Sequence, residues 1–355
     1  MKRILMTTAA FGLVAGMAQA GGVERSHSPY AILWEKGNYA ELSFGYAAPD
    51  VSGAVGGGAV RSGDMADNYM QFSLGLKYAL NDRLDLAIVL DQPIGADVAY
   101  PASGAPYPLA GSTGTIDSTA ITALARYHFD GGFSIHGGIK AERVKGNVAL
   151  PFMGYSLRTS TETDLGYLIG AAYEKPEIAL RVALTYQSSI THDMDATENG
   201  AATGSFEIEV PKSVTLDFQS GVAKDTLVFG SIRWRDWTSF NITPPVYGGL
   251  AGALVDYDKD VITYTLGVGR RFNENWSGAI SFGYEASNGF TTGNLGPHDG
   301  MRSITLGGSY TKDNMKITAG VSYIDIGDAV TNPPISGVFT DNSGIGVGVK
   351  IGYSF

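Results

Sequence analysis

The chain has 355 residues, carries a formal net charge of −10 and contains no cysteine. A disulfide framework and a thiolate metal site are therefore excluded, and so acidic a chain is a poor partner for nucleic acid. The hydrophobic share of 44% with only 17% charged residues also excludes a disordered chain. The 48 glycines follow no collagen-like triplet and accompany 19 tyrosines, a composition that favours an all-β protein.

Residues 1–20 have the plan of a secretory signal peptide. Lys2 and Arg3 form a basic start, the stretch from Ile4 to Met17 is mostly apolar, and 18–20 read Ala-Gln-Ala, an A-x-A cleavage site. The apolar stretch is shorter than the roughly 20 residues of a membrane-spanning helix, which makes an anchor the weaker interpretation. The mature chain would begin at Gly21 as an exported protein, either soluble or a β-barrel.

From residue 38 onward the sequence alternates between segments of period two and connections of two kinds. Very short polar turns alternate with long connections rich in glycine, proline and serine. The long connections are 48–68, 92–116, 147–160, 192–210, 238–260, 289–301 and 327–342. About fourteen strands lie between them: 38–47, 69–79, 83–91, 117–129, 132–146, 161–174, 177–190, 212–222, 226–237, 261–272, 276–287, 302–311, 315–325 and 343–355. An even number of strands, with short turns at one end and long loops at the other, predicts an outer-membrane β-barrel over 38–355.

The two faces of the strands support this prediction. Ile178, Leu180 and Val182 alternate with polar residues, and aromatic residues stand at strand ends as in the girdles of membrane barrels. The last strand ends on Phe355, which resembles the C-terminal signature that outer-membrane barrels present to the barrel-assembly machinery. We therefore expect the apolar face to contact outer-membrane lipid and lipopolysaccharide. The alternative is a periplasmic all-β protein with the apolar face buried.

The residues of the lumen and loops give weak signals for chemistry. His128 and His136 could share a lumenal hairpin, but nothing marks the serine and the orienting group that a lipid hydrolase would need. The acidic clusters Asp193/Asp195 and Asp256/Asp258/Asp260 could bind calcium, yet they lack the pattern of a defined calcium loop, and solvated loop charges are the better interpretation. We expect no enzyme activity, no metal and no cofactor.

The stretch LDQPIGADVAYP interrupts the third strand. Pro93 cannot donate to a strand ladder and Gly95 weakens it, so the barrel wall should break there. The alternative is that the strand ends at Asp91 and a loop begins.

The stretch VPKSVTLDFQSGVAKDTLVFGSIRWRDWTSF resembles a segment of the FadL family, fourteen-stranded outer-membrane transporters of long-chain fatty acids and other hydrophobic compounds. The resemblance rests on six residues of a Pro-x-Ser hairpin that runs into a strand ending in Trp-x-x-Trp/Phe: Pro211, Ser213, Leu216, Trp234, Trp237 and Phe240. APDVSG after the first strand, the Pro-x-Gly of Pro93 and Gly95, and the terminal Phe355 are also similar.

The resemblance implies passive transport of a long-chain fatty acid or another hydrophobic molecule, captured by loops and released sideways through a break at Pro93 and Gly95. It also implies an N-terminal hatch at 21–37, with Ser28, Pro29, Tyr30 and Ala31 where the family often has Asn-Pro-Ala. Because the hatch is short and the loops are modest in length, a smaller hydrophobic compound is an alternative substrate. Ten apolar loop residues could contact the ligand or pack the loops over the barrel: Val98, Tyr100, Tyr107, Leu109, Phe152, Met153, Val246, Tyr247, Leu250 and Leu254. Four basic residues could bind a carboxylate or form ion pairs in the lumen: Arg126, Lys140, Arg233 and Arg235.

Two other functions remain open on the sequence. A general diffusion porin would show steady ion conductance, and an outer-membrane lipid hydrolase would lose activity when His128 and His136 are replaced.

Overall fold

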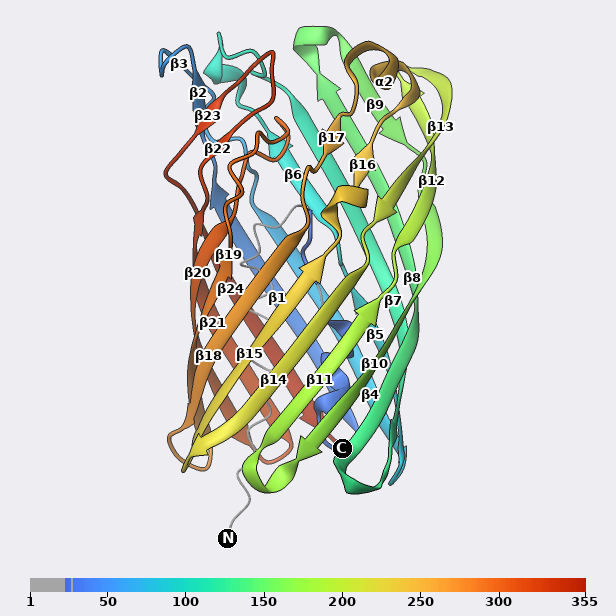
Figure 1. Cartoon of the computed structure of the whole chain (residues 1–355), viewed down its shortest axis with the longest axis vertical. Coiled ribbons are helices and arrows are strands. Elements are labelled where there is room, and N and C mark those ends of the chain that lie inside the picture. Colours follow the sequence, from blue (N-terminus) through green and yellow to red (C-terminus); the bar gives the residue numbers. More distant parts are fainter. Residues whose placement is uncertain (1–22, 27) are drawn as a thin grey trace.

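The computed structural model describes residues 23–26 and 28–355, so the expected signal peptide at 1–20 lies outside the described residues. Fourteen antiparallel strands form a closed barrel (Figure 1). They are β1 (Tyr39–Asp50), β4 (Tyr69–Asn81), β5 (Leu84–Asp91), β7 (Thr113–His128), β8 (Phe133–Leu150), β10 (Glu162–Lys175), β11 (Leu180–Gln187), β14 (Ser213–Ala223), β15 (Thr226–Arg235), β18 (Val261–Arg271), β19 (Trp276–Glu285), β20 (Met301–Lys312), β21 (Met315–Ile326) and β24 (Asn342–Ser354). β24 pairs with β1 from Tyr39↔Ser354 to Asp50↔Ser343, which closes the ring and confirms the predicted strand number.

The apolar face of the strands points outward. Leu74, Leu165 and Phe282 are exposed, whereas Lys77 and Thr185 are buried in the lumen. A soluble sandwich would have the opposite arrangement. Hydrogen-bonded ladders join the backbones of neighbouring strands around the ring, because backbone polar groups in hydrocarbon need partners within the protein. The chain is therefore a transmembrane β-barrel of the outer-membrane type.

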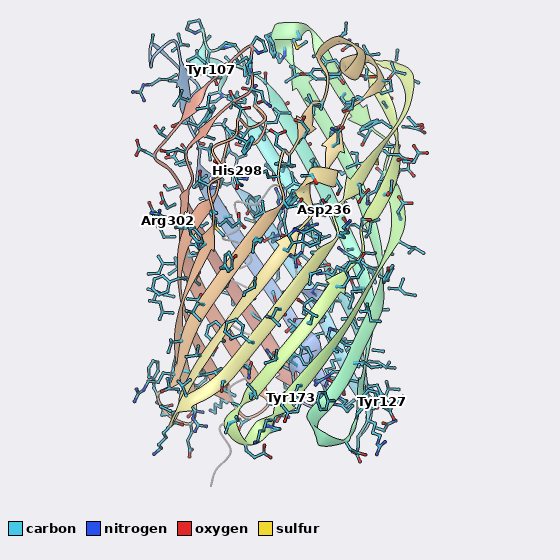
Figure 2. The ribbon with its side chains drawn as sticks, viewed as in Figure 1. Tyr107, Tyr127, Tyr173, Asp236, His298 and Arg302 are labelled. Atoms are coloured by element: carbon cyan, nitrogen blue, oxygen red, sulfur yellow. The ribbon has the colours of Figure 1, made fainter. Side chains whose placement is uncertain are left out.

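Aromatic side chains gather near the short turns. Tyr127 packs on Phe129 and Phe133 on Tyr173, with ring centroids 4.9 and 4.8 Å apart. Figure 2 shows Tyr127 and Tyr173 at the same end of the barrel. Such rings are typical of a girdle at a membrane interface.

Within residues 23–26 and 28–355, no helix is both long and apolar enough to cross a membrane. One α-helix, α2 (Pro245–Ala251), lies among the long connections. The 3-10 helices are η2 (Pro29–Trp34), η3 (Ala102–Gly104), η4 (Asp130–Gly132), η5 (Pro151–Met153), η6 (Pro176–Ile178) and η7 (Trp237–Ser239).

The long connections build the other end of the molecule. Their strands are β2 (Gly53–Val55), β3 (Val60–Arg61), β6 (Gly95–Ala99), β9 (Tyr155–Thr159), β12 (Ile190–Glu198), β13 (Ala201–Val210), β16 (Asn241–Ile242), β17 (Val255–Asp256), β22 (Ala329–Val330) and β23 (Val338–Phe339). The segment 192–210, expected to be a loop, is largely the β12–β13 hairpin. Its polar composition concealed an alternation in which His192 and Met194 are buried while Asp193 and Asp195 are exposed.

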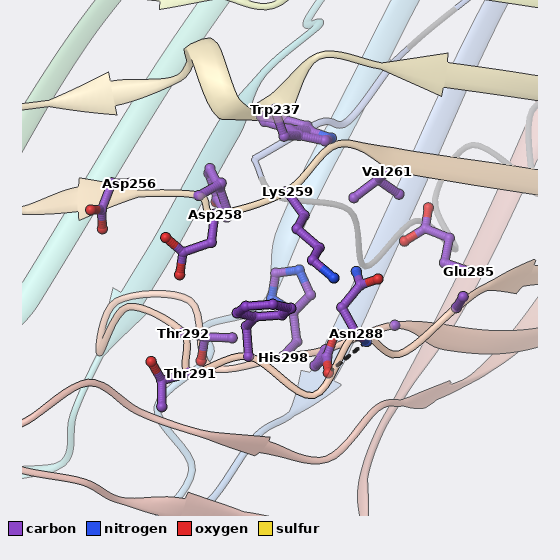
Figure 3. A pocket seen from close by; sticks show the side chains of 15 residues that line it. Trp237, Asp256, Asp258, Lys259, Val261, Glu285, Asn288, Thr291, Thr292 and His298 are labelled. Atoms are coloured by element: carbon purple, nitrogen blue, oxygen red, sulfur yellow. Dashed lines mark hydrogen bonds between the residues drawn. The ribbon is translucent and has the colours of Figure 1, made fainter.

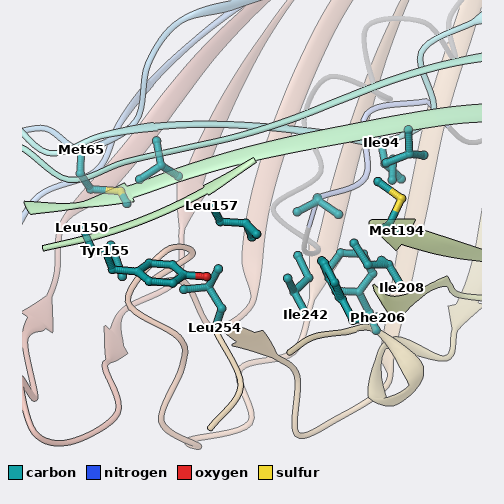
Figure 4. Close-up of a cluster of buried hydrophobic side chains, with 14 of the residues drawn as sticks. Met65, Ile94, Leu150, Tyr155, Leu157, Met194, Phe206, Ile208, Ile242 and Leu254 are labelled. Carbon is teal, nitrogen blue, oxygen red and sulfur yellow. The ribbon is translucent and has the colours of Figure 1, made fainter. Parts of the chain in front are cut away.

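The upper lumen contains the main hydrophobic core. Figure 4 shows part of it, where Met194 of β12, Phe206 and Ile208 of β13 and Ile242 of β16 converge with Ile94, which lies between β5 and β6. Trp237 and Phe240, from the segment that carries the family resemblance, are almost fully buried in the same core. Tyr30, Ile32, Leu33 and Trp34 of η2 are also buried, and η2 contacts β4, β5 and β7. η2 therefore lies inside the barrel.

Candidate functional site: a wall gap beneath apolar cavities

The third barrel strand is interrupted between Asp91 and Gly95. β5 pairs with β4 only from Asn81↔Leu84 to Leu74↔Leu90, whereas β6 pairs with β7. Tyr69–Ser73 of β4 therefore face Asp91–Gly95 without a ladder, and the amide N–H of Phe72 donates to the side-chain oxygen of Gln92 at 3.1 Å. Above this point pairing resumes, with Asp67 N–H donating to the Asp97 carbonyl at 3.0 Å. We call the space between 69–73 and 91–95 the wall gap.

Residues 23–26, here called the N-terminal or covering segment, cover the wall gap from inside. Gly95 N–H donates to the Val23 carbonyl at 2.8 Å, and Arg25 N–H donates to the Pro93 carbonyl at 2.9 Å. Ser26 Oγ donates to Asp91 Oδ2 at 2.5 Å. The segment therefore supplies backbone partners that the interrupted strand lacks.

The side chain of Arg25 bridges the two sides of the gap. Its guanidinium is ion-paired with Asp97 on β6 and lies 4.1 Å from the ring centroid of Tyr69 on β4. A Cβ added at Gly95 would collide with this guanidinium. Glycine at 95 thus gives Arg25 the room to occupy the gap.

Two apolar cavities lie above the N-terminal segment. The upper apolar cavity has a volume of about 530 Å³, and its lining includes Val23, Ala96 and Leu254. The inner apolar cavity, of about 390 Å³, is lined in part by Ile94 and Phe240. The two cavities share Thr115, Ile116, Val148 and Ile242. Both therefore reach the interrupted strand.

A third cavity, here the polar cavity, measures about 410 Å³ and contacts Pro93. Lys140, Arg233 and Arg235 line it together with Glu24. Glu24 accepts from Arg233 Nη2 at 2.6 Å and is also ion-paired with Arg235, while Lys140 Nζ lies 2.6 Å from Glu142. Three of the predicted carboxylate contacts thus meet in one cavity, each engaged by an internal acid.

A fourth cavity, at the loop end, has a volume of about 600 Å³ (Figure 3). Lys259 Nζ lies 3.9 Å from the ring centroid of Phe290, and Tyr257 and Asp256 are shared with the upper apolar cavity. Burial, followed by the charge of Asp258, raises the pKa of Asp256. Burial lowers the pKa of His298. This cavity joins the loops to the apolar space beneath.

The other predicted ligand contacts lie elsewhere. Tyr100, Tyr107 and Leu109 are buried in the upper core, where the two tyrosine rings stack 5.6 Å apart. Phe152, Met153 and Leu250 are exposed on the loops, and Tyr247 is partly buried in α2. Arg126 is ion-paired with Glu174 and lies 4.1 Å from the ring of Trp34. Of the predicted apolar contacts, Val98 and Leu254 line the upper apolar cavity.

The histidines and acidic clusters are placed as follows. His128 Nε2 lies 2.8 Å from Asp85, and His136 Nε2 lies 2.9 Å from Thr185. Neither imidazole is hydrogen-bonded to a serine within the part of the chain that the structure describes. Among those same residues, no group of three His, Asp or Glu is placed to hold a metal ion.

Several cavity and gap residues were missed by sequence reasoning. Ile116 and Ile242 face the lumen from segments assigned to long loops, and Val23 and Arg25 belong to the expected hatch without a motif of their own. The alternation of Gly114, Ile116 and Ser118 could have placed Ile116 on the lumenal face. Nothing local indicates that Arg25 meets Asp97, 72 residues away.

Solved structures with the same architecture exist, although the sequence matches no protein-family model and no curated protein. A Pseudomonas aeruginosa FadL homologue superposes with a TM-score of 0.73 at 16% identity, covering 92% of each chain. The Ralstonia pickettii toluene transporter TbuX gives a TM-score of 0.65 at 14% identity, covering 98% of this chain and 99% of its own. The Pseudomonas putida toluene transporter TodX gives a TM-score of 0.65 at 13% identity, covering 92% of each chain. The chain therefore has the fold of the FadL family, in agreement with the resemblance in its sequence.

Proposed function

We propose that the chain is a passive outer-membrane passage for small hydrophobic compounds, which bind in the apolar cavities and leave sideways through the wall gap. The observation that carries the proposal is that both apolar cavities reach the interrupted strand, the upper one at Ala96 and the inner one at Ile94, and that Val23 of the covering segment lines the upper one. A compound leaving there would enter lipid beside the exposed Met70 and Phe72. In this scheme residues 38–355 are the barrel and 21–37 the hatch.

The linings of the two apolar cavities favour a neutral compound over a long-chain acid. The upper apolar cavity has no lysine or arginine in its lining and includes Asp256. The inner apolar cavity has one cation, Lys145, which is paired with Asp117 at 3.4 Å. An ionised carboxylate would lose its hydration there without gaining a partner. Structural neighbours described as toluene transporters support this choice, and fatty-acid transport stays a prediction for the same experiment.

The filled lumen argues against a general diffusion porin. The buried η2 side chains pack against β4, β5 and β7, where a porin would carry an aqueous channel. Contacts with lipopolysaccharide, and recognition of Phe355 by the barrel-assembly machinery, stay predictions.

Ile116→Trp tests the proposal because Ile116 lines both apolar cavities. In cells lacking their own transporter, we expect uptake of labelled toluene to fall about tenfold, a loss of about 1.4 kcal/mol in binding. The matched control is Ile121→Trp, which makes the same change on the lipid-exposed face of β7. Heat-modifiable gel migration would establish that both variants assemble. Unchanged uptake in an assembled Ile116→Trp barrel would refute the proposed route, and labelled fatty acid measured in parallel decides between the two substrates.

A further inference from the structure

The barrel wall has a second discontinuity, between β10 and β12. The β10–β11 ladder ends at Leu168↔Gln187, above which Ser188 N–H donates to the Tyr167 carbonyl at 2.9 Å. Pairing resumes where Ser160 N–H donates to the Asp195 carbonyl at 2.8 Å. Among the described residues, no backbone hydrogen bond joins 161–166 to 189–194. We call this stretch the β10–β12 seam.

A mismatch of the pleats accounts for the missing ladder. In β11 the buried side chains are at odd-numbered positions such as Ala183 and Thr185. In β12 they are at the even-numbered positions Ile190 and His192, so the alternation shifts by one residue across Ser188–Ser189. Continuing the Ala196↔Thr159 register would place exposed Leu165 opposite buried Ile190. Residues directly opposite in an antiparallel pair point to the same side, so this ladder cannot form.

The seam is closed by contacts between side chains, in place of backbone hydrogen bonds. Asp164 Oδ2 lies 2.8 Å from His192 Nδ1. A Cβ added at Gly166 would lie 2.6 Å from Ile190 Cγ1, so Ile190 occupies the space that the glycine leaves. His192 is fully buried, and its Nε2 has no hydrogen-bond partner in the described part of the chain. The wall gap has the same construction, with Gly95 on one side and Arg25 filling the space.

The polar cavity reaches the seam from inside the barrel. Its lining includes Gly166 and Ile190 from the seam, Tyr167 and Ser188 at the end of the intact pairing, and Pro93 from the wall gap. Lys140, Arg233 and Arg235 share this lining with Glu24, and Glu142 pairs with Lys140 from outside the lining, so three cations stand against two carboxylates. The cavity therefore offers net positive charge directly behind the seam.

The outer surface of the seam differs from that of the wall gap. Thr163, Thr191 and Asp193 are exposed around it, and the rings of Tyr167 and Tyr186 lie 6.0 Å apart below it. Paired tyrosines are typical of the interface between hydrocarbon and head groups. The seam thus opens at the level of the head groups (Figure 1 shows β12 beyond the end of β11).

We propose that the β10–β12 seam is a second lateral port, through which amphipathic molecules with an anionic head group enter the polar cavity from the outer leaflet. The head group approaches Lys140 and the two arginines, and the apolar tail passes between Leu165 and Ile190. The inference rests on the proposed function, because it supplies a separate entrance to the same barrel. It assigns charged amphiphiles to the seam and neutral compounds to the loop end.

Cysteine cross-linking tests the port, since the natural sequence has no cysteine. Leu165→Cys with Thr191→Cys places one thiol on the outer surface of each side of the seam, next to the Asp164–His192 contact. Ile169→Cys with Tyr186→Cys is the matched control, because that pair already faces outward across an intact ladder. Both are treated with a short thiol-reactive cross-linker in cells lacking their own transporter, and uptake of dodecanoate and of toluene is measured.

We expect the seam cross-link to lower dodecanoate uptake about fivefold or more, the equivalent of about 1 kcal/mol, and to leave toluene uptake unchanged. Unchanged dodecanoate uptake would overturn the proposal, and so would an equal loss of both compounds. A third pair, Phe72→Cys with Gln92→Cys across the wall gap, separates the two proposals. If cross-linking it leaves toluene uptake intact, lateral release fails while the seam result stands.

Ile190→Ala provides an independent measurement without cross-linking. Removing the side chain that fills the seam should raise dodecanoate uptake, whereas Ile169→Ala on the lipid face should not. A decrease or no change in an assembled Ile190→Ala barrel would contradict the port.

Discussion

At the scale of single residues, the wall gap depends on the pairing of a glycine with an arginine from a distant segment. Gly95 has no side chain, and the guanidinium of Arg25 occupies the adjoining space between Tyr69 and Asp97. A valine at 95 would therefore displace Arg25 as well as fill the break. Replacing Arg25 separates these two effects.

Arg25→Ala should open the wall gap while leaving the strands unchanged. Loss of the ion pair and of the contact with Tyr69 would destabilise the closed arrangement by about 1.4 kcal/mol, which raises the open population about tenfold. We expect faster toluene uptake and greater sensitivity of the cells to hydrophobic antibiotics. Arg83→Ala, at an exposed arginine paired with Asp130 at 3.3 Å, is the control and should change neither. Equal uptake by Arg25→Ala and the unmodified chain would show that Arg25 does not close the gap.

At the scale of elements, one carboxylate attaches α2 to the β12–β13 hairpin. Buried Glu198 accepts from the backbone N–H groups of Val246 at 2.8 Å and Tyr247 at 2.9 Å, and from Tyr155 Oη at 2.8 Å. Thr203 Oγ1 also donates to it, at 2.6 Å. Burial acts to raise the pKa of Glu198, but the hydrogen bonds outweigh it and the pKa is lowered.

Glu198→Ala should release α2 from the hairpin. A carboxyl with a lowered pKa contributes stability above its ordinary pKa and loses it as the pH falls through the lowered value. We therefore expect the protection of amides in 244–252, measured against the intrinsic exchange rate at each pH, to be high at neutral pH and to fall in acid or in Glu198→Ala at neutral pH. Glu207→Ala, on the next strand, should leave exchange in that segment unchanged. Slow exchange in Glu198→Ala would mean that other contacts hold α2.

At the scale of the whole molecule, closure of the barrel depends on the first and last strands. β1 and β24 are joined by backbone pairs along their length and by a lumenal ion pair, in which Lys350 Nζ lies 3.0 Å from Glu41 Oε2. Both side chains are nearly buried, so removing one partner leaves an uncompensated charge in the lumen.

Lys350→Met should weaken the closed barrel, because Glu41 loses its partner. Breaking a buried pair in this way costs about 3 kcal/mol. We expect a lower temperature for the heat-induced change in gel migration, whereas Lys312→Met at an exposed turn should leave that temperature unchanged. An unaltered midpoint would indicate that other lumenal groups compensate for Glu41.

The sequence by itself determined the barrel, its fourteen strands and the alternation of short turns and long loops. These features are local, because side chains of a strand alternate between two faces and turn residues mark its ends. Pro93 and Gly95 stand where β5 gives way to β6, and the lack of an N–H and of a side chain are properties of the residues themselves; their role as a lateral opening stays a prediction.

Only the tertiary structure decided what fills and surrounds the interruption. Arg25 meets Asp97 across 72 residues, and Glu24 meets Arg235 across 211, distances at which no local pattern is informative. The apolar cavities arise where Val23, Ile116 and Ile242 converge from separate segments. The β10–β12 seam depends on the relative pleat of two strands that are each regular alone, so it exists only where they meet.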